Sequence, residues 1–117
     1  LLISECIEKE IPIITSGGAG GKKDISKIDI RNIKRTYKDK LSAAVRREFR
    51  QKHKENWNKS DGVYIPCVFS PESISYADKD KGAKLNCRGG LGSVGHVTAA
   101  FGLHMVNYVL NEFTKSE

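Results

Sequence analysis

The sequence predicts one α/β domain with a mixed β-sheet, flanking helices and a long C-terminal helix. A short apolar segment at residues 11–15 runs into a glycine-rich loop, as strands of α/β folds do at their sites. Apolar and polar residues alternate around residues 28–33, which indicates a strand, and residues 93–113 show helical spacing. A length of 117 residues suits a single small domain.

The first two predicted elements are a helix end and a buried strand. Residues 1–9 begin in the middle of an apolar helical pattern, with no initiator Met and no cap, so we expect the chain to be a piece of a longer protein. Residues 11–15 are continuously apolar apart from their last position, as in a buried strand. Pro12 must lie at the beginning of this strand, or where no ladder hydrogen bond is needed.

Four glycines occupy five positions in the loop at residues 17–21. A phosphate-binding P-loop is excluded, because Ser16 stands where its first Gly is required and Lys23 where its Ser or Thr is required. The dinucleotide-binding fingerprint is excluded because it must open a helix, whereas a strand-like run follows here. Two interpretations remain open, a tight structural turn and a direct contact with a ligand.

Residues 39–53 form the next predicted helix, after the strand at residues 28–33. Asp39 is the expected N-cap, because its carboxylate can accept from the free N–H groups of the first turn. The expected inner face follows three-to-four spacing. It comprises Leu41, Ala44, Val45, Phe49 and Lys52.

This helix lies within a strongly basic part of the chain. Residues 22–59 carry 14 basic and 5 acidic side chains, whereas the rest of the chain carries 6 and 9. Such a block favours a polyanionic partner, with nucleic acid foremost, and Arg46, Arg47, Arg50 and Lys54 are the candidate phosphate contacts. The alternative is a solvated surface with Arg–Glu pairing through Glu48.

The following segment, residues 54–62, is polar and is predicted to be a loop. Trp57 within it is either a packing anchor or a platform on which a base stacks; the sequence does not decide. Residues 63–70 are predicted as a second apolar strand, interrupted by Pro66. Residues 76–84 are charged.

The last predicted helix begins at the cap Ser93 and runs to about residue 113. Its apolar side comprises Val94, Val97, Phe101, Met105 and Tyr108. A second stripe holds only small residues, Gly95, Ala99 and Gly102, which would let the helix lie close to a sheet or another helix. Polar residues, including His96 and His104, interrupt the apolar run of this helix, so we expect a buried domain helix and no membrane insertion. The two histidines lack a carboxylate at matching spacing and are interpreted as ordinary helix residues.

A second glycine-rich loop, residues 85–92, precedes this helix. Cys87 lies in it near the positive end of the helix, where the pKa of a thiol falls, so Cys87 is the candidate reactive group. The alternative is a small residue in a tight turn. No C-x-x-C pair links Cys6, Cys67 and Cys87, which removes the usual zinc spacing. The odd number of cysteines, without a recognisable secretion signal, favours reduced thiols in a cytosol-like compartment.

Three stretches together resemble the tRNA threonylcarbamoyladenosine dehydratases, a branch of the ThiF/MoeB/HesA adenylating enzymes related to ubiquitin-activating proteins. They are residues 11–21 with Gly-Gly-Ala-Gly-Gly, residues 67–72 with Cys-Val-Phe-Ser-Pro-Glu, and residues 87–102 with Val-Thr-Ala-Ala-Phe-Gly. The basic helix also resembles the family, so the likeness covers nearly the whole chain. Arg88 stands where a small residue is expected, and the absence of C-x-x-C pairs agrees with this branch.

The resemblance implies the C-terminal half of a Rossmann-like adenylating domain in a cytoplasmic homodimer. The implied reaction adenylates the threonylcarbamoyl carboxylate on tRNA with ATP and Mg²⁺ and then closes a ring. The nucleotide-binding residues would lie upstream of this chain. The resemblance further implies a monovalent cation, Na⁺ or K⁺, held by backbone carbonyls near Cys87, Arg88 and Gly90, with residues 17–21 as a second location.

Two alternatives remain. An activator of a ubiquitin-like or sulfur-carrier protein would form a thioester or persulfide on Cys87 or Cys67, and a sulfur-transfer partner is compatible with the dehydratase as well. A non-catalytic tRNA-binding remnant would have lost its nucleotide-binding half. As a fragment of a longer enzyme, this chain alone is expected to be inactive. A mitochondrial, surface-associated protein is the alternative to a cytoplasmic one.

Overall fold

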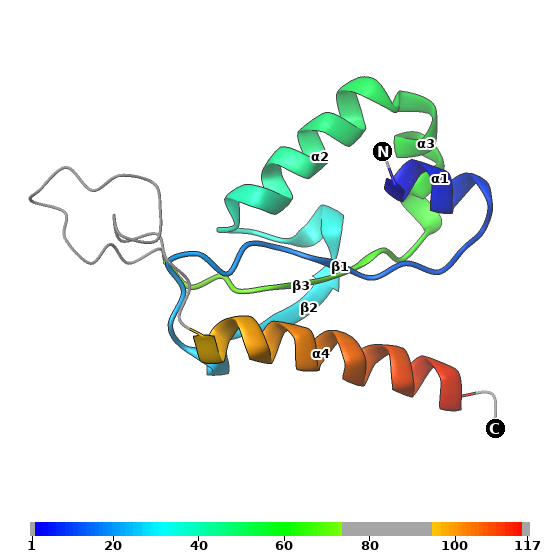
Figure 1. The fold of residues 1–117 in the computed structure, drawn as a ribbon. Helices are drawn as coiled ribbons and strands as arrows, with labels where there is room; N and C mark the ends of the chain where they lie inside the picture. Colours follow the sequence, from blue (N-terminus) through cyan, green and yellow to red (C-terminus); the bar gives the residue numbers. More distant parts are fainter. Residues whose placement is uncertain (1, 74–94, 116–117) are drawn as a thin grey trace, which may run out of the picture.

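A computed structural model describes residues 2–73 and 95–115. Figure 1 shows three short strands between one layer of three helices and a single long helix. The elements are α1 (Leu2–Glu8), β1 (Thr15–Ser16), η1 (Ile25–Lys27), β2 (Asp29–Asn32), η2 (Ile33–Arg35), α2 (Lys40–Lys52), α3 (Lys54–Lys59), η3 (Ser60–Gly62), β3 (Pro66–Phe69) and α4 (Gly95–Thr114). The predicted mixed α/β architecture with a long final helix is confirmed.

The sheet has the order β1-β3-β2, with β1 parallel and β2 antiparallel to the central β3. All four residues of β3 are buried, because helices cover both faces of this strand. Cys67 and Phe69 belong to the core beneath α1, α2 and α3, while Val68 between them belongs to the core beneath α4. The alternation of side chains along one strand therefore divides the apolar interior into two clusters.

The predicted strand at residues 11–15 is wrong in extent, since β1 contains only Thr15 and Ser16. Thr15 pairs with Cys67, so one step toward the N-terminus the ladder would reach Pro66. Proline has no N–H to donate, and the strand is therefore not extended in that direction. The Thr15 hydroxyl instead donates to the Pro66 carbonyl at 2.9 Å. Ile11 is half exposed, whereas Ile13 and Ile14 pack against the two clusters without strand geometry.

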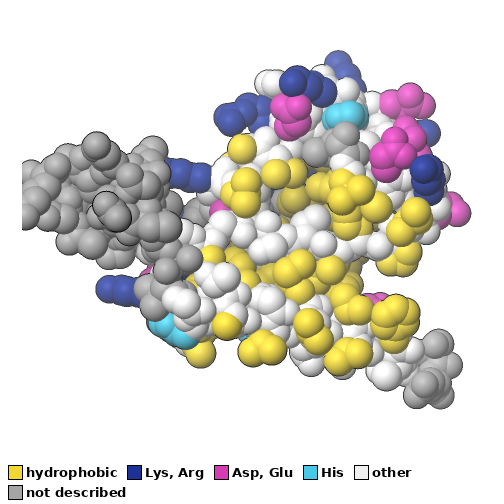
Figure 2. Space-filling view, in the orientation of Figure 1, with side chains coloured by type: hydrophobic (Ala, Val, Ile, Leu, Met, Phe, Trp, Pro, Cys, Tyr) yellow, Lys and Arg dark blue, Asp and Glu magenta, His cyan; other side chains and the backbone are white. Residues whose placement is uncertain are grey.

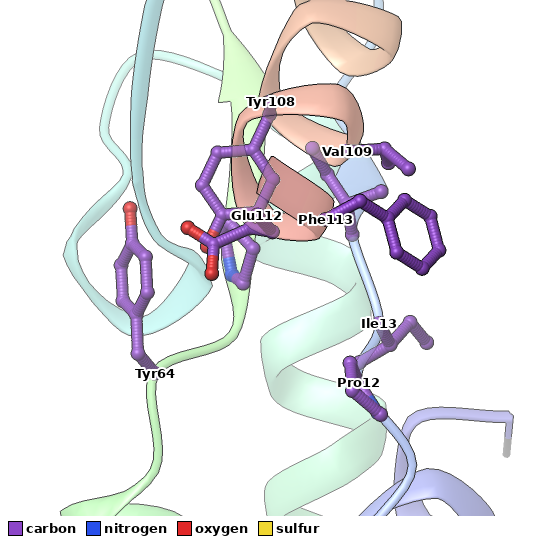
Figure 3. Close-up of a pocket in the computed structure, with 9 residues that line it drawn as sticks. Pro12, Ile13, Tyr64, Tyr108, Val109, Glu112 and Phe113 are labelled. Carbon is purple, nitrogen blue, oxygen red and sulfur yellow. The ribbon is translucent and has the colours of Figure 1, made fainter. Parts of the chain in front are cut away.

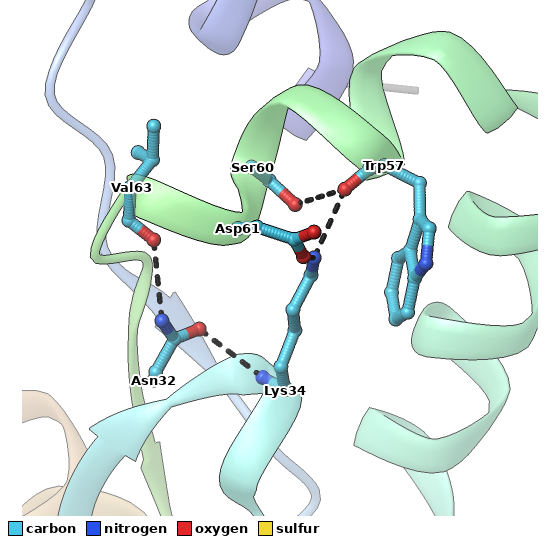
Figure 4. Close-up of polar contacts among 6 residues, drawn as sticks. All are labelled: Asn32, Lys34, Trp57, Ser60, Asp61 and Val63. Atoms are coloured by element: carbon cyan, nitrogen blue, oxygen red, sulfur yellow. Dashed lines mark hydrogen bonds and ion pairs between the residues drawn. The ribbon is translucent and has the colours of Figure 1, made fainter.

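The predicted loop at residues 54–62 is also wrong, because it forms α3 and η3. Trp57 projects from α3 against the core. Its ring packs edge-on against the Phe49 ring, and the two ring centroids are 5.3 Å apart. The Lys34 ammonium lies 4.1 Å from the centre of the indole and also contacts Asp61 at 2.8 Å (Figure 4). Trp57 is thus a packing anchor already in contact with a cation, which answers the question that the sequence left open.

The two long helices confirm most of the predicted inner faces. Asp39 caps α2, and Phe49 is fully buried, but Leu41 is 49% exposed and Ser42 is buried in its place. Lys52 of the predicted inner stripe is exposed as well. The reason is the first turn of α2, where Ser42 turns inward to meet the Asp39 carboxylate.

In α4, the predicted apolar side faces the sheet, with Val97 and Phe101 buried and Met105 packed against them. The expected close packing of the small residues is wrong for the described chain. Gly95 and Gly102 have no atom within 4 Å of the place where a Cβ would stand, and Ala99 is exposed. Among the described helices, none is both long enough and apolar enough to cross a membrane.

Candidate functional site

The candidate site lies where β1 and β3 end side by side. Because the two strands are parallel, their carboxyl ends meet at one edge of the sheet, the position at which α/β folds bind ligands. The Gly17 N–H donates to the Val68 carbonyl at 2.8 Å, so the glycine loop leaves β1 in contact with β3. The start of α2 approaches the same edge.

Asp39 connects the start of α2 to the glycine loop. Its carboxylate accepts hydrogen bonds from Ser42 Oγ at 2.5 Å, the Gly18 N–H at 3.2 Å and the Leu41 N–H at 3.3 Å. The Asp39 side chain lies so close to Gly17 that a Cβ there would stand 1.8 Å from Oδ2. Glycine is required at position 17 by this close approach, and the carboxylate is both an N-cap and an anchor for the loop.

Lys22 and Glu72 add a second connection, which the sequence analysis did not find. Lys22 follows the glycine loop and is only 2% exposed; its Nζ donates to the main-chain carbonyls of Lys38 and Glu72. The Glu72 carboxylate accepts from the N–H groups of Lys23 and Asp24 at 2.9–3.1 Å. Burial lowers the pKa of Lys22, and the charges of Asp39 and Glu72 oppose that shift.

Two further side chains lie at or beneath this edge. Cys67 is fully buried, with its Sγ 3.5 Å from Ser42 Oγ, so it is closed to a carrier protein. His96, in the first turn of α4, places Nε2 2.9 Å from the Lys23 carbonyl and is exposed. The loop is therefore held from both faces of the sheet, by α2 on one and by α4 on the other.

The four basic residues predicted to bind phosphate do not share one environment. Arg46 is half-buried, and its Nη1 donates to the Ile33 carbonyl and to the Thr36 hydroxyl, so it fastens η2 to α2. Arg47, Arg50 and Lys54 are exposed. Glu48 pairs with Lys52 at 3.0 Å rather than with an arginine.

Figure 2 shows Lys and Arg side chains on the outer side of the helical layer that contains α2, interspersed with acidic ones. Cys87, Arg88 and Gly90, the predicted reactive thiol and cation-binding carbonyls, lie outside the described residues. Among the described residues, no three His, Cys, Asp or Glu side chains gather in a metal-binding arrangement.

A cavity of about 570 Å³ lies away from this edge, between residues 12–14 and the end of α4 (Figure 3). Apolar side chains line most of it, and the Tyr64 and Tyr108 rings stand 6.5 Å apart by centroids. Burial raises the pKa of both tyrosines. Its carboxylate, Glu112, is already paired with Lys115 at 2.8 Å, so this cavity offers less reactive chemistry than the carboxyl edge.

No family model matches the chain. The chain is 32% identical, over 99% of its length, to the tRNA threonylcarbamoyladenosine dehydratase of Haemophilus influenzae, and 31% identical, over 95%, to that of Escherichia coli. Its structure superposes on the crystal structure of the E. coli enzyme in complex with AMP with a TM-score of 0.75, at 30% identity over 95% of this chain. The resemblance to this family is confirmed.

The similarity to these dehydratases covers only part of their length. The chain spans 46% of the length of both curated relatives and 41% of the superposed crystal chain. A second crystal structure of the E. coli enzyme, in complex with ATP, superposes with a TM-score of 0.71 at 29% identity. The similarity therefore extends over nearly all of this chain but over less than half of those enzymes.

Proposed function

We propose that this chain is the C-terminal part of an ATP-dependent tRNA threonylcarbamoyladenosine dehydratase. The observation that carries the proposal is a likeness of 31–32% identity along at least 95% of the chain to enzymes named for this activity. The E. coli enzyme is described with AMP and with ATP, which supports a nucleotide-dependent reaction. ATP and Mg²⁺ would be bound mainly by the half of the protein that this chain does not contain.

The proposed reaction joins the threonylcarbamoyl carboxylate to AMP and releases pyrophosphate. The carbamoyl group then attacks the activated acyl carbon, a ring closes, and AMP departs, so the modified base loses one water overall. Such chemistry depends on positioning and on neutralising phosphate charge. The part proposed for this chain is to present a structured loop edge and a basic surface to the tRNA, in a cytoplasmic homodimer.

The test uses the complete polypeptide, with ATP and tRNA that carries threonylcarbamoyladenosine. Nucleosides from digested tRNA should show the modified adenosine lighter by one water, only when ATP is present. This chain by itself should be inactive. If the protein binds the tRNA but leaves its threonylcarbamoyladenosine unchanged, the result would instead support the non-catalytic remnant.

The carrier-protein alternative has less support among the described cysteines. Cys67 is fully buried, and Cys6 is half-buried in α1. Mass spectrometry after incubation with ATP and a carrier protein decides this point, because a covalent adduct on cysteine would overturn the tRNA proposal.

For the tRNA surface, we propose Arg47, Arg50 and Lys54 as phosphate contacts. Arg46 is better suited to support the helix, because its guanidinium is already hydrogen-bonded within the chain. Replacing the three exposed residues with Ala in the complete protein should reduce the slope of log K against log salt by about 0.9 for each lost contact. Lys9→Ala, at an exposed position just after α1, is the control. An unchanged slope in the triple variant would remove α2 and the start of α3 from the interface.

A further inference from the structure

Lys22 is an unusual residue because its ammonium group is buried. Lysine is almost never fully buried unless its charge is compensated, yet this side chain is only 2% exposed. Its neighbour Lys23 is exposed, so the burial belongs to one position and not to the segment. The Lys22 side chain is therefore held by specific contacts.

The direct contacts of Lys22 Nζ are neutral main-chain oxygens. It donates to the Lys38 carbonyl at 3.1 Å and to the Glu72 carbonyl at 2.5 Å. The carboxylates of Asp39 and Glu72 act from further away, by charge alone. Asp39 is itself 5% exposed and is occupied by Ser42 and Gly18, so it contributes negative potential rather than a bond to the ammonium.

These contacts join three segments that are distant in the sequence. Lys22 directly follows the glycine loop after β1, Lys38 precedes the cap of α2, and Glu72 follows β3. Glu72 is bound twice, because its carbonyl accepts from Lys22 while its carboxylate accepts from the main chain of Lys23 and Asp24. All three segments meet at the carboxyl edge of the sheet.

Converging carbonyl oxygens with negative charge behind them are also the surroundings in which proteins hold a dehydrated monovalent cation. An apolar side chain at position 22 could fill the same volume but would leave two partly buried carbonyls without the Lys22 donor, which is unfavourable. The arrangement of the oxygens therefore favours a cation or a strong donor between them.

We propose that the Lys22 ammonium is a built-in monovalent cation that positions the three segments at this edge, and that the same oxygens bind ammonium or potassium ion once the side chain is shortened. Lys22 is a positioning residue in this account. The inference rests on the contacts of Lys22 and is independent of the proposed function.

The test compares Lys22→Ala, Lys22→Met and Lys23→Ala in the complete polypeptide. Alanine opens the space that the side chain filled, methionine fills it without a charge, and Lys23→Ala removes a neighbouring charge that makes no such contacts. Unfolding by urea is followed while ammonium or potassium chloride replaces lithium chloride at constant ionic strength. Tetramethylammonium chloride, whose cation is too large for the space, is the second reference salt.

We expect only Lys22→Ala to gain stability in ammonium or potassium relative to lithium beyond the gain of the native protein. For a single site, its folding equilibrium shifts about tenfold when the cation reaches ten times its Kd. Lys22→Met and Lys23→Ala should respond to the four salts as the native protein does, so that the response of any other cation site cancels. A general response of Lys22→Ala to every salt overturns the proposal, as does a Lys22→Ala variant that ammonium and potassium cannot restore.

Discussion

The two long helices, α2 and α4, lie on opposite faces of the sheet and differ in what they present outward. Each buries a phenylalanine against β3, Phe49 at 0% exposed and Phe101 at 4%. On its outer side α4 keeps Leu103 and Leu110 exposed by 69% and 57%. The outer side of α2 is charged, and Figure 2 shows apolar side chains along α4 in the same view. Helical periodicity therefore identifies the inner face of a helix and does not determine the chemistry of its outer face.

The helices also differ in how their first turns are held. The first turn of α2 is fixed by Asp39, which contacts the glycine loop and Ser42. The first turn of α4 is held by the buried Val97 and by one described side-chain hydrogen bond, between His96 and the Lys23 carbonyl. We expect substitutions near the start of α2 to be felt at the candidate site, whereas the outer positions of α4 should respond as an isolated helix would.

The largest effects are expected where the two helices are alike. Phe49→Ala should lower the free energy of unfolding by about 4 kcal/mol and Phe101→Ala by about 3 kcal/mol, because each leaves a cavity in a packed cluster. Phe49 should cost more, since its ring also packs edge-on against Trp57. Urea unfolding of the two variants measures both values. A loss below about 1 kcal/mol for Phe101→Ala would contradict the packing of α4 described above.

A smaller effect is expected at the glycine loop. Gly17→Ala should cost about 2 kcal/mol, because the new methyl group would overlap the Asp39 carboxylate and force an anchored side chain to move. Gly18→Ala is the matched control, since its Cβ would meet atoms no closer than 3.6 Å, and we expect a change within about 0.5 kcal/mol. Equal losses at both positions would show that general loop flexibility, not contact with α2, determines the cost.

The fold shows which elements can be predicted from the sequence and which cannot. The inner face of α4 and the cap of α2 were predictable because both depend on residues a few positions apart. The extent of β1 was not, because it depends on Pro66, which is distant in the sequence and lies next in the ladder. The helix α3 was missed because its segment is polar and only Asn56 and Trp57 turn toward the interior.

The candidate site was predictable only in part, for the same reason. The glycine loop marked the edge of the sheet at which the structure brings Asp39, Lys22 and Glu72 together, and Asp39 was identified from its local role as a cap. Lys22 was not identified, because the carbonyls that hold it come from residues 16 and 50 positions further along the chain. Arg46 looked like its neighbours in the sequence, and only the fold shows that its guanidinium supports η2.

The smallest predicted effect tests the outer side of α4. Gly102 lies in the middle of this helix, and no atom stands within 4 Å of the position of an added Cβ. Gly102→Ala should therefore raise the free energy of unfolding of this chain by up to about 1 kcal/mol, the difference in helix propensity between the two residues. Gly95→Ala, at the first residue of the same helix, should gain less, because the N-terminal residue has fewer backbone restraints to satisfy. Urea unfolding of both variants compares the gains, and a loss of stability in Gly102→Ala would show that the small residues of α4 are packed closely after all.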